Sequence, residues 1–134
     1  MTTLSNFKVR TGGKTDWINI TSEVQKAVTA SGVREGICIV FIPHTTAAVT
    51  INENADSDVP HDVNHALNRI SPDRPEFRHG EGNSAAHTKS SLVSPSLSLI
   101  ITDGKLLLGT WQGIWFCEFD GPRSRNVYVK VQSE

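Results

Sequence analysis

The strongest constraint on the fold of this chain is the dipeptide Asp103-Gly104, which separates two strand-like segments, residues 97–102 and 105–108. Asp-Gly between two such segments is a strong short-range signal for a β-hairpin, because both residues tolerate the positive φ of a tight turn. Two further strand-like segments follow, residues 114–119 and 126–131. The last third of the chain is therefore predicted to be antiparallel β-structure.

Earlier segments mix strands with helices. Strand patterns cover residues 4–10, 17–20, 36–42 and 47–51. Helical patterns begin near Thr21, Asp56 and Ala85, and Gly32 is the expected end of the first. Because strands outnumber helices, we expect an α+β fold with a mostly antiparallel β-sandwich and two to three short helices. The length fits a single domain over residues 1–134.

The charge balance excludes several classes of partner. A net charge of −1 provides no general field that attracts nucleic acid or an anionic membrane. No apolar stretch approaches the roughly 18–20 residues that span a bilayer, and the N-terminus lacks the basic and apolar regions of a signal peptide. We therefore expect a cytoplasmic protein with no nucleic-acid or membrane partner. Cys38 and Cys117 lie in apolar segments and are expected to be buried thiols.

The chemically active side chains fall mainly in polar segments between these elements. His44 follows the proline that ends a β-branched strand, and strand ends often present functional side chains. Glu53 follows the next strand, and the sequence does not decide whether it reaches His44. His79, Glu81 and His87 lie in and after a glycine-bearing loop. We interpret these five residues as candidate catalytic groups, although each loop could also be plain polar surface.

A second group of side chains is suited to a phosphorylated ligand. Hydroxyls, amides and cationic groups bind phosphate oxygens, and an indole offers a plane on which a ring can stack. Asn83 or Ser84 is also expected to cap a short helix over residues 85–92, whose free amides would form an anion site. The candidate substrate-binding or phosphate-binding residues are Thr45, Thr46, Asn52, Asn83, Lys89, Trp111, Gln112, Arg123 and Arg125.

One motif imitates a metalloprotease helix. His61-Asp62-Val63-Asn64-His65 has the two histidine positions of HExxH, but Asp62 replaces the glutamate and has a shorter reach. We favour a solvated helix face for this segment. Asp62 is retained as a further candidate catalytic residue, because it could still point toward the site.

The three imidazoles of His44, His79 and His87 leave two chemistries open. They could bind a divalent metal, zinc or magnesium, with an open fourth position of the kind that catalytic zinc has. They could equally act without a metal, as acid–base or phosphate-binding groups. The spacing of the histidines does not decide between these alternatives.

Seven motifs of the chain resemble the YjbQ-like family, and together they are highly specific. In order they cover most of residues 36–131, whereas His65 has no counterpart in the family pattern. The matching motifs are Pro43-His44-Thr45-Thr46-Ala47-Ala48, Ile51-Asn52-Glu53-Asn54, Pro60-His61-Asp62, His79-Gly80-Glu81-Gly82-Asn83, Ala86-His87-Thr88-Lys89-Ser90-Ser91, Gly109-Thr110-Trp111-Gln112-Gly113-Ile114 and Glu118-Phe119-Asp120-Gly121-Pro122-Arg123.

The resemblance implies a β-rich, jelly-roll-like domain that assembles as a homotrimer. It also implies a site that gathers His44, His79 and His87, with a subunit boundary as one possible location. The family is commonly assigned a secondary thiamine-phosphate synthase activity, which joins a pyrimidine pyrophosphate to a thiazole phosphate and releases pyrophosphate. We therefore expect a transferase-type enzyme with a phosphorylated small-molecule substrate. The alternatives are a metal-assisted hydrolase and a non-enzymatic module that binds a small molecule or a metal.

Overall fold

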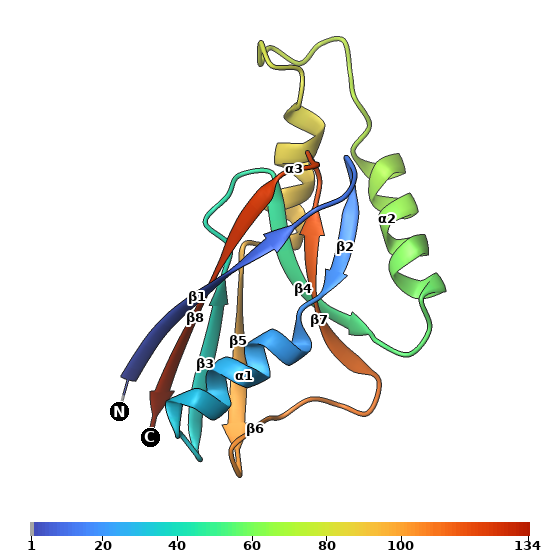
Figure 1. Ribbon diagram of the computed structural model, residues 1–134. Helices are drawn as coiled ribbons and strands as arrows, with labels where there is room; N and C mark the ends of the chain where they lie inside the picture. The colour runs from blue at the N-terminus through green and yellow to red at the C-terminus, as the bar shows by residue number, and fades with distance from the viewer. Residues whose placement is uncertain (1) are drawn as a thin grey trace.

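The computed structural model describes residues 2–134, which form two sheets and three helices (Figure 1). The strands are β1 (Thr2–Arg10), β2 (Asp16–Asn19), β3 (Gly36–Phe41), β4 (Ala47–Glu53), β5 (Ser96–Thr102), β6 (Lys105–Leu106), β7 (Gln112–Glu118) and β8 (Ser124–Ser133). The helices are α1 (Thr21–Ser31), α2 (Asp58–Ile70) and α3 (Ser84–Val93).

Both sheets are antiparallel. Five strands form one sheet in the order β1-β8-β3-β5-β6, and three form a second sheet in the order β2-β7-β4. Strand β8 lies between β1 and β3, so that Val129 pairs with Ser5 on one side and with Val40 on the other. The predicted α+β fold with mostly antiparallel sheets and short helices is confirmed.

The main core lies between the two sheets, where α1 packs against both. It includes Val40, Phe116 and Val129 from the strands, and Val24 and Val28 from α1. All five side chains are fully buried. The β-branched and aromatic residues that favoured strands in the sequence are therefore the ones that remove apolar surface from water.

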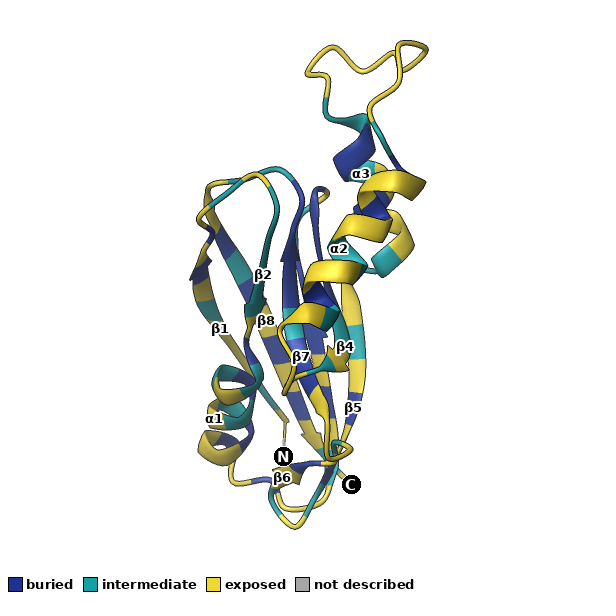
Figure 2. Ribbon diagram, turned by 90° about the vertical axis from the view of Figure 1, so that its right-hand side faces the viewer, coloured by how far each residue is buried: buried dark blue, intermediate teal, exposed yellow. Residues whose placement is uncertain are grey.

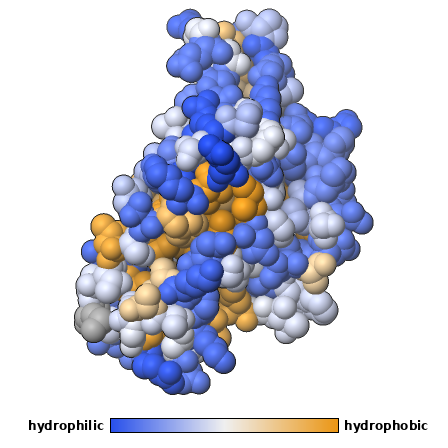
Figure 3. All heavy atoms as spheres, viewed as in Figure 1, coloured by the Kyte–Doolittle hydropathy of each residue, from blue (hydrophilic) through white to orange (hydrophobic). Residues whose placement is uncertain are grey.

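Helices α2 and α3 cover the other face of the second sheet and create a smaller core (Figures 1 and 2). Its buried members are Ala48, Leu67, Ala86, Cys117 and Phe119. The connection between the two helices projects beyond the sheets and is almost entirely exposed (Figure 2). Figure 3 shows that this projection is mainly hydrophilic, whereas apolar residues gather lower on the same face.

Two local predictions are confirmed by backbone geometry. Asp103 and Gly104 have φ values of 52° and 75°, and the two residues join β5 to β6 as a tight hairpin. Gly32 ends α1 in the left-handed conformation, with φ of 74°. Cys38 and Cys117 are buried free thiols, as expected, and burial raises the pKa of Cys38 to about 11.

The outer face of the five-stranded sheet is covered by no other described element. The run over residues 36–42 was expected to form a central strand, and β3 is central in its sheet. Only alternate side chains of β3 face the core, however. The exposed apolar side chains of this outer face are Leu4, Ile37, Ile39, Phe41, Ile100 and Tyr128. Within residues 2–134, no helix combines the length and apolar character needed to cross a membrane.

Candidate functional site

Three segments that are distant in the sequence enclose a cavity of about 390 Å³, which we call the histidine cavity. The first segment follows β3, the second comprises the loop before α3 and the first turn of that helix, and the third joins β7 to β8. Most of the lining is polar, and it contains all three of the histidines that the sequence singled out. The lining residues are Pro43, His44, Thr45, Thr46, His79, Glu81, Asn83, His87, Asp120, Arg123 and Arg125.

His44 is held by β8. The backbone N–H of Asn126 donates a hydrogen bond of 2.8 Å to His44 Nε2. A neutral imidazole has one acceptor nitrogen, so this bond assigns the proton to Nδ1 and leaves Nδ1–H as the polar group that His44 offers to a ligand. Burial lowers the pKa of His44, and the positive charge of Arg125 lowers it further, against an opposing effect of Glu118. His44 is therefore a fixed, neutral donor.

His79 and His87 meet across the cavity. Their ring centroids are 5.3 Å apart in an edge-to-face arrangement. His87 lies in the first turn of α3, whereas His79 lies in the exposed loop. Nε2 of His79 is 3.9 Å from Oε1 of Glu81, whose side chain is largely solvent-exposed. Each ring has two nitrogen atoms that can donate or accept a hydrogen bond with a ligand.

Asp120 links two of the candidate phosphate-binding residues. Its Oδ2 accepts a hydrogen bond of 2.8 Å from Nδ2 of Asn83 and one of 3.0 Å from Nη2 of Arg123. Asn83 occupies the N-cap position of α3, but its side chain does not cap the helix. The prediction of a side-chain cap at Asn83 or Ser84 was wrong, because the Asn83 amide binds Asp120 and Ser84 is already the first helical residue.

Arg125 supports the site from inside the protein. Its guanidinium and the Glu118 carboxylate form a two-pronged ion pair, and both side chains are almost completely buried. Nη2 of Arg125 also donates a hydrogen bond of 2.8 Å to the Thr46 hydroxyl, which ties β8 to the segment that carries His44. The positive charge of Arg125 is therefore already neutralised by Glu118. Arg125 acts mainly by holding β8 against the segment that carries His44.

Four predicted site residues lie at the end of β4 that is farther from the histidine cavity. Asn52 and Glu53 end that strand, and Gln112 is the cross-strand partner of Glu53 at the start of β7. The oxygen of the Gln112 side chain accepts a hydrogen bond from the Gly109 amide, which shapes the turn. Trp111 is 63% exposed in the same turn. The structure therefore does not bring these four residues to the histidine cavity of their own chain.

Two further predicted residues point elsewhere. Asp62 lies on the exposed face of α2, where Oδ1 is 3.1 Å from Nδ1 of His61. Lys89 is on α3 but does not line the histidine cavity, and it is buried in a neighbouring cavity instead.

A three-imidazole metal centre is not formed by these residues. Within residues 2–134, no group of three or more histidine, cysteine, aspartate or glutamate side chains is arranged to hold a metal ion. The geometry of His44 explains part of this result, because the Asn126 amide occupies the nitrogen lone pair that a metal would need. A requirement for zinc or magnesium stays a prediction.

Sequence reasoning missed two acidic residues that organise the site. Asp120 lines the histidine cavity, and Glu118 is fully buried beneath it. Both lie within the motif Glu118-Phe119-Asp120-Gly121-Pro122-Arg123. A signal was available, since an acidic residue inside an apolar strand requires a buried partner, and two arginines follow within seven residues.

Comparisons with known proteins show that the chain has relatives in bacteria and archaea. The chain is 50% identical over 128 residues to UPF0047 protein MJ1081 of Methanocaldococcus jannaschii, covering 96% of this chain and 93% of that protein. It is 46% identical to UPF0047 protein YugU of Bacillus subtilis, covering 96% and 98% of the two chains.

Solved structures agree with this relationship. A crystal structure of an uncharacterized YjbQ/UPF0047 protein from Clostridium acetobutylicum shares 51% identity and superimposes with a TM-score of 0.93, covering 96% of this chain and 99% of that one. A YbjQ-like protein of unknown function from Sulfolobus solfataricus has a TM-score of 0.95 at 28% identity, covering 100% and 99%. The family model described as UPF0047 protein YjbQ-like matches residues 5–134. The chain belongs to the UPF0047 YjbQ-like family.

Proposed function

We propose that this protein is an enzyme that binds a phosphorylated small molecule in the histidine cavity. The observation that carries the proposal is the gathering of three imidazoles, the Arg123 guanidinium and the start of α3 around one cavity. Guanidinium groups, imidazole N–H groups and the first amides of a helix are donors suited to phosphate oxygens. A cavity of about 390 Å³ is of the size that accepts small molecules.

The two kinds of histidine have different roles in this proposal. His44 donates Nδ1–H to an oxygen of the ligand, and its neutral state is kept by the Asn126 hydrogen bond and by burial. His79 and His87 are the acid–base groups, and Glu81 lies 3.9 Å from His79 at the edge of the cavity. Arg123 supplies positive charge at the edge of the cavity, where Asp120 fixes its direction.

In its finer form, the proposal is a transfer reaction of the thiamine-phosphate synthase type. A pyrimidine pyrophosphate and a thiazole phosphate are joined, and pyrophosphate leaves with the electrons of the broken bond. Negative charge then grows on the leaving oxygen, and donors that are already in place stabilise it most effectively. The support for this reaction is the family resemblance together with the phosphate-binding character of the cavity. A cytoplasmic location belongs to the same proposal.

The decisive experiment measures pyrophosphate release with purified single variants. We expect His44→Gln, His79→Gln and His87→Gln each to lower kcat/KM by about 10²-fold or more, as removal of an acid–base or donor group does. Melting temperatures should stay close to that of the unmodified protein. His65→Gln is the matched control, because His65 is an exposed histidine on α2 outside the cavity. If all three cavity variants are as active as the control, the proposal is wrong.

The alternatives from the sequence predict different measurements. A metal-assisted hydrolase requires a metal in the purified protein and phosphoester hydrolysis that a chelator abolishes. Its ligand set would have to be completed by a rearrangement or by a second subunit, since the described part of one chain does not supply it. A non-enzymatic binding module predicts retention of one ligand per chain without turnover.

We also propose that the protein assembles as a homotrimer through the outer face of the five-stranded sheet. The support is the set of exposed apolar side chains on β1, β3, β5 and β8, because monomeric proteins rarely leave a contiguous apolar patch of this kind in water. Light scattering coupled to gel filtration measures the mass. A monomer at micromolar concentration would contradict this part of the proposal.

A further inference from the structure

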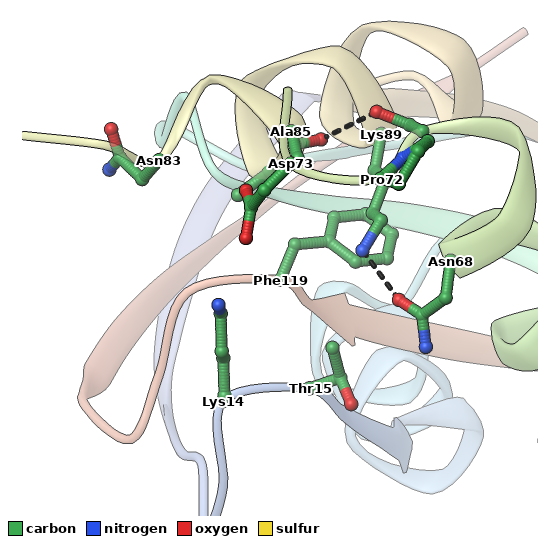
Figure 4. A pocket seen from close by; sticks show the side chains of 11 residues that line it. Lys14, Thr15, Asn68, Pro72, Asp73, Asn83, Ala85, Lys89 and Phe119 are labelled. Carbon is green, nitrogen blue, oxygen red and sulfur yellow. Dashed lines mark hydrogen bonds between the residues drawn. The ribbon is translucent and has the colours of Figure 1, made fainter. Parts of the chain in front are cut away.

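A second cavity of about 290 Å³ lies beside the histidine cavity and contains a buried lysine (Figure 4). It is enclosed by the end of α2, the start of α3, the β1–β2 connection and the residue after β7. We call it the lysine cavity. The residues of its lining that matter here are Lys14, Asn68, Asp73, Asn83, Lys89 and Phe119.

Lys89 is 7% exposed, yet it has no carboxylate partner. Its Nζ donates one hydrogen bond of 2.6 Å to Oδ1 of Asn68 and lies 6.0 Å from the ring centroid of Phe119. No ion pair involving Lys89 is present in residues 2–134. An ammonium group has three N–H donors, so two of them remain for another acceptor. A buried charge in this state is costly unless an anion joins it.

Lys14 reaches the same cavity from the opposite side. Figure 4 shows its ammonium group directed into the cavity on the side where the Asp73 carboxylate lies, with the Phe119 side chain between it and the ammonium group of Lys89. The one carboxylate in the lining, that of Asp73, is exposed to water and forms no ion pair with either lysine. Burial lowers the pKa of Lys89, and the charge of Lys14 lowers it further, with Asp73 opposing them. The cavity thus has two cationic groups against one hydrated carboxylate.

We propose that the lysine cavity is a binding site for a phosphate-class anion, held by the ammonium groups of Lys89 and Lys14. The unused N–H donors of Lys89 and the ammonium group of the exposed Lys14 would contact the anion from two sides. The Phe119 side chain, over whose ring the Lys89 ammonium lies, forms an apolar part of the same lining. A divalent cation would be repelled by this lining, and a macromolecule is too large for it.

The two cavities adjoin at Asn83, which lines both of them. Its Nδ2 binds Asp120 in the histidine cavity, whereas its Oδ1 is buried without a hydrogen-bond partner. One carboxamide thus separates two cavities that both contain cationic side chains. If the proposed function is correct, the lysine cavity holds the phosphate of the second phosphorylated reactant. This role of the lysine cavity rests on the proposed function, whereas the anion site itself does not.

The test is a titration of the protein with inorganic phosphate at constant ionic strength, followed by amide NMR shifts and by melting temperature. In the unmodified protein we expect saturable shifts at the amides of Lys14, Asn68 and Lys89, and a rise in melting temperature. Lys14→Ala removes an exposed group without disturbing the core, and it should weaken phosphate binding at these amides by about tenfold. Lys89→Met should abolish the shifts at Lys14 and Asn68.

Lys26→Ala is the matched control, because Lys26 is an exposed lysine on α1 outside both cavities. It should bind phosphate as the unmodified protein does. The proposal is overturned if Lys14→Ala and Lys89→Met retain the affinity of the control, or if phosphate shifts only the amides around His79 and His87. Activity is not used in this test, so failure of the proposed function and failure of the anion site are separate results.

Discussion

The ion pair between Glu118 and Arg125 is the interaction whose removal should damage this protein most. The Glu118 carboxylate accepts hydrogen bonds from Arg125 at both oxygens, from the Thr11 hydroxyl at 2.9 Å and from the Asp120 amide at 3.0 Å. Both charged side chains are almost wholly excluded from water. In Glu118→Gln, the Arg125 charge would remain buried without a counter-charge, and one of the former acceptor positions would become a donor.

The expected cost can be estimated from this geometry. Removing one partner of a buried pair costs about 3–5 kcal/mol, because the other charge stays uncompensated in a medium of low dielectric constant. A domain of this kind has a total stability of about 5–15 kcal/mol. The loss is therefore a large fraction of the whole, and it corresponds to a decrease in melting temperature of roughly 10–20 °C.

Urea unfolding of three variants tests this reasoning. Glu118→Gln should lose about 3–5 kcal/mol, whereas the double variant Glu118→Leu/Arg125→Met should recover most of that loss, since packed apolar side chains need no counter-charge. The control is Asp103→Asn, which removes the exposed pair with Arg34 and should cost less than about 1 kcal/mol. If Glu118→Gln is no less stable than the control, the ion pair does not stabilise the fold as we infer.

The pH dependence of stability provides an internal check. Burial by itself would raise the pKa of Glu118, but the hydrogen bonds from Arg125, the Asp120 amide and Thr11 outweigh it and lower the pKa below its ordinary value of 4.5. Stability from this group is therefore complete above about pH 4.5 and is lost as the pH falls through the lower pKa of the folded state. Glu118→Gln should lose this acid-dependent part of the stability curve.

Three other outcomes are expected. Burial lowers the pKa of His44 below 6.5, so His44 takes up a proton in the unfolded chain at a higher pH than in the folded protein. The stability contributed by neutral His44 should therefore be complete above pH 6.5 and decrease below it. Between pH 7 and pH 5, the urea midpoint of His44→Gln should fall less steeply than that of the unmodified protein. Gly36→Ala should lose about 2 kcal/mol or more in urea unfolding, because the new Cβ would lie 2.0 Å from the Gln132 carbonyl oxygen; unchanged stability would contradict the register of β3 and β8. Ile39→Lys, on the outer sheet face, should reduce the mass seen by light scattering, whereas Leu107→Lys, an exposed apolar control on a loop, should not.

The features that sequence reasoning predicted correctly are those that depend on neighbouring residues. The hairpin at Asp103-Gly104 and the end of α1 at Gly32 require a positive φ, and only a few residue types adopt it without strain. The placement of His44 at a strand end and of His87 in the first turn of a helix has the same local origin. The convergence of these side chains on one cavity, by contrast, depends on how distant strands pair.

The residues that were misplaced show where local reasoning ends. Glu53 is the last residue of β4 and His44 precedes the first, so a strand of seven residues at about 3.3 Å each separates them by roughly 20 Å. The placement of Lys89 could have been anticipated, because His87 and Lys89 are two positions apart on a helix and residues so spaced do not share a face. The orientation of the Asn83 side chain could not have been anticipated. Its hydrogen-bond acceptor is Asp120, which lies in a turn 37 residues later in the sequence.

The two halves of the histidine cavity are held by different interactions. His44, Thr46 and Arg125 are fixed by β8 and by a buried ion pair, so the donors on this side are positioned before any ligand arrives. His79 and Glu81 lie in an exposed loop whose side chains have few contacts within the described chain. The acid–base role that we propose for His79 needs positioning as accurate as that of the donors, and under this proposal a ligand or a second subunit supplies the remaining contacts of the loop. In the proposed function, the rigid half therefore selects the ligand, and the exposed half takes its final geometry when a substrate or a second subunit binds.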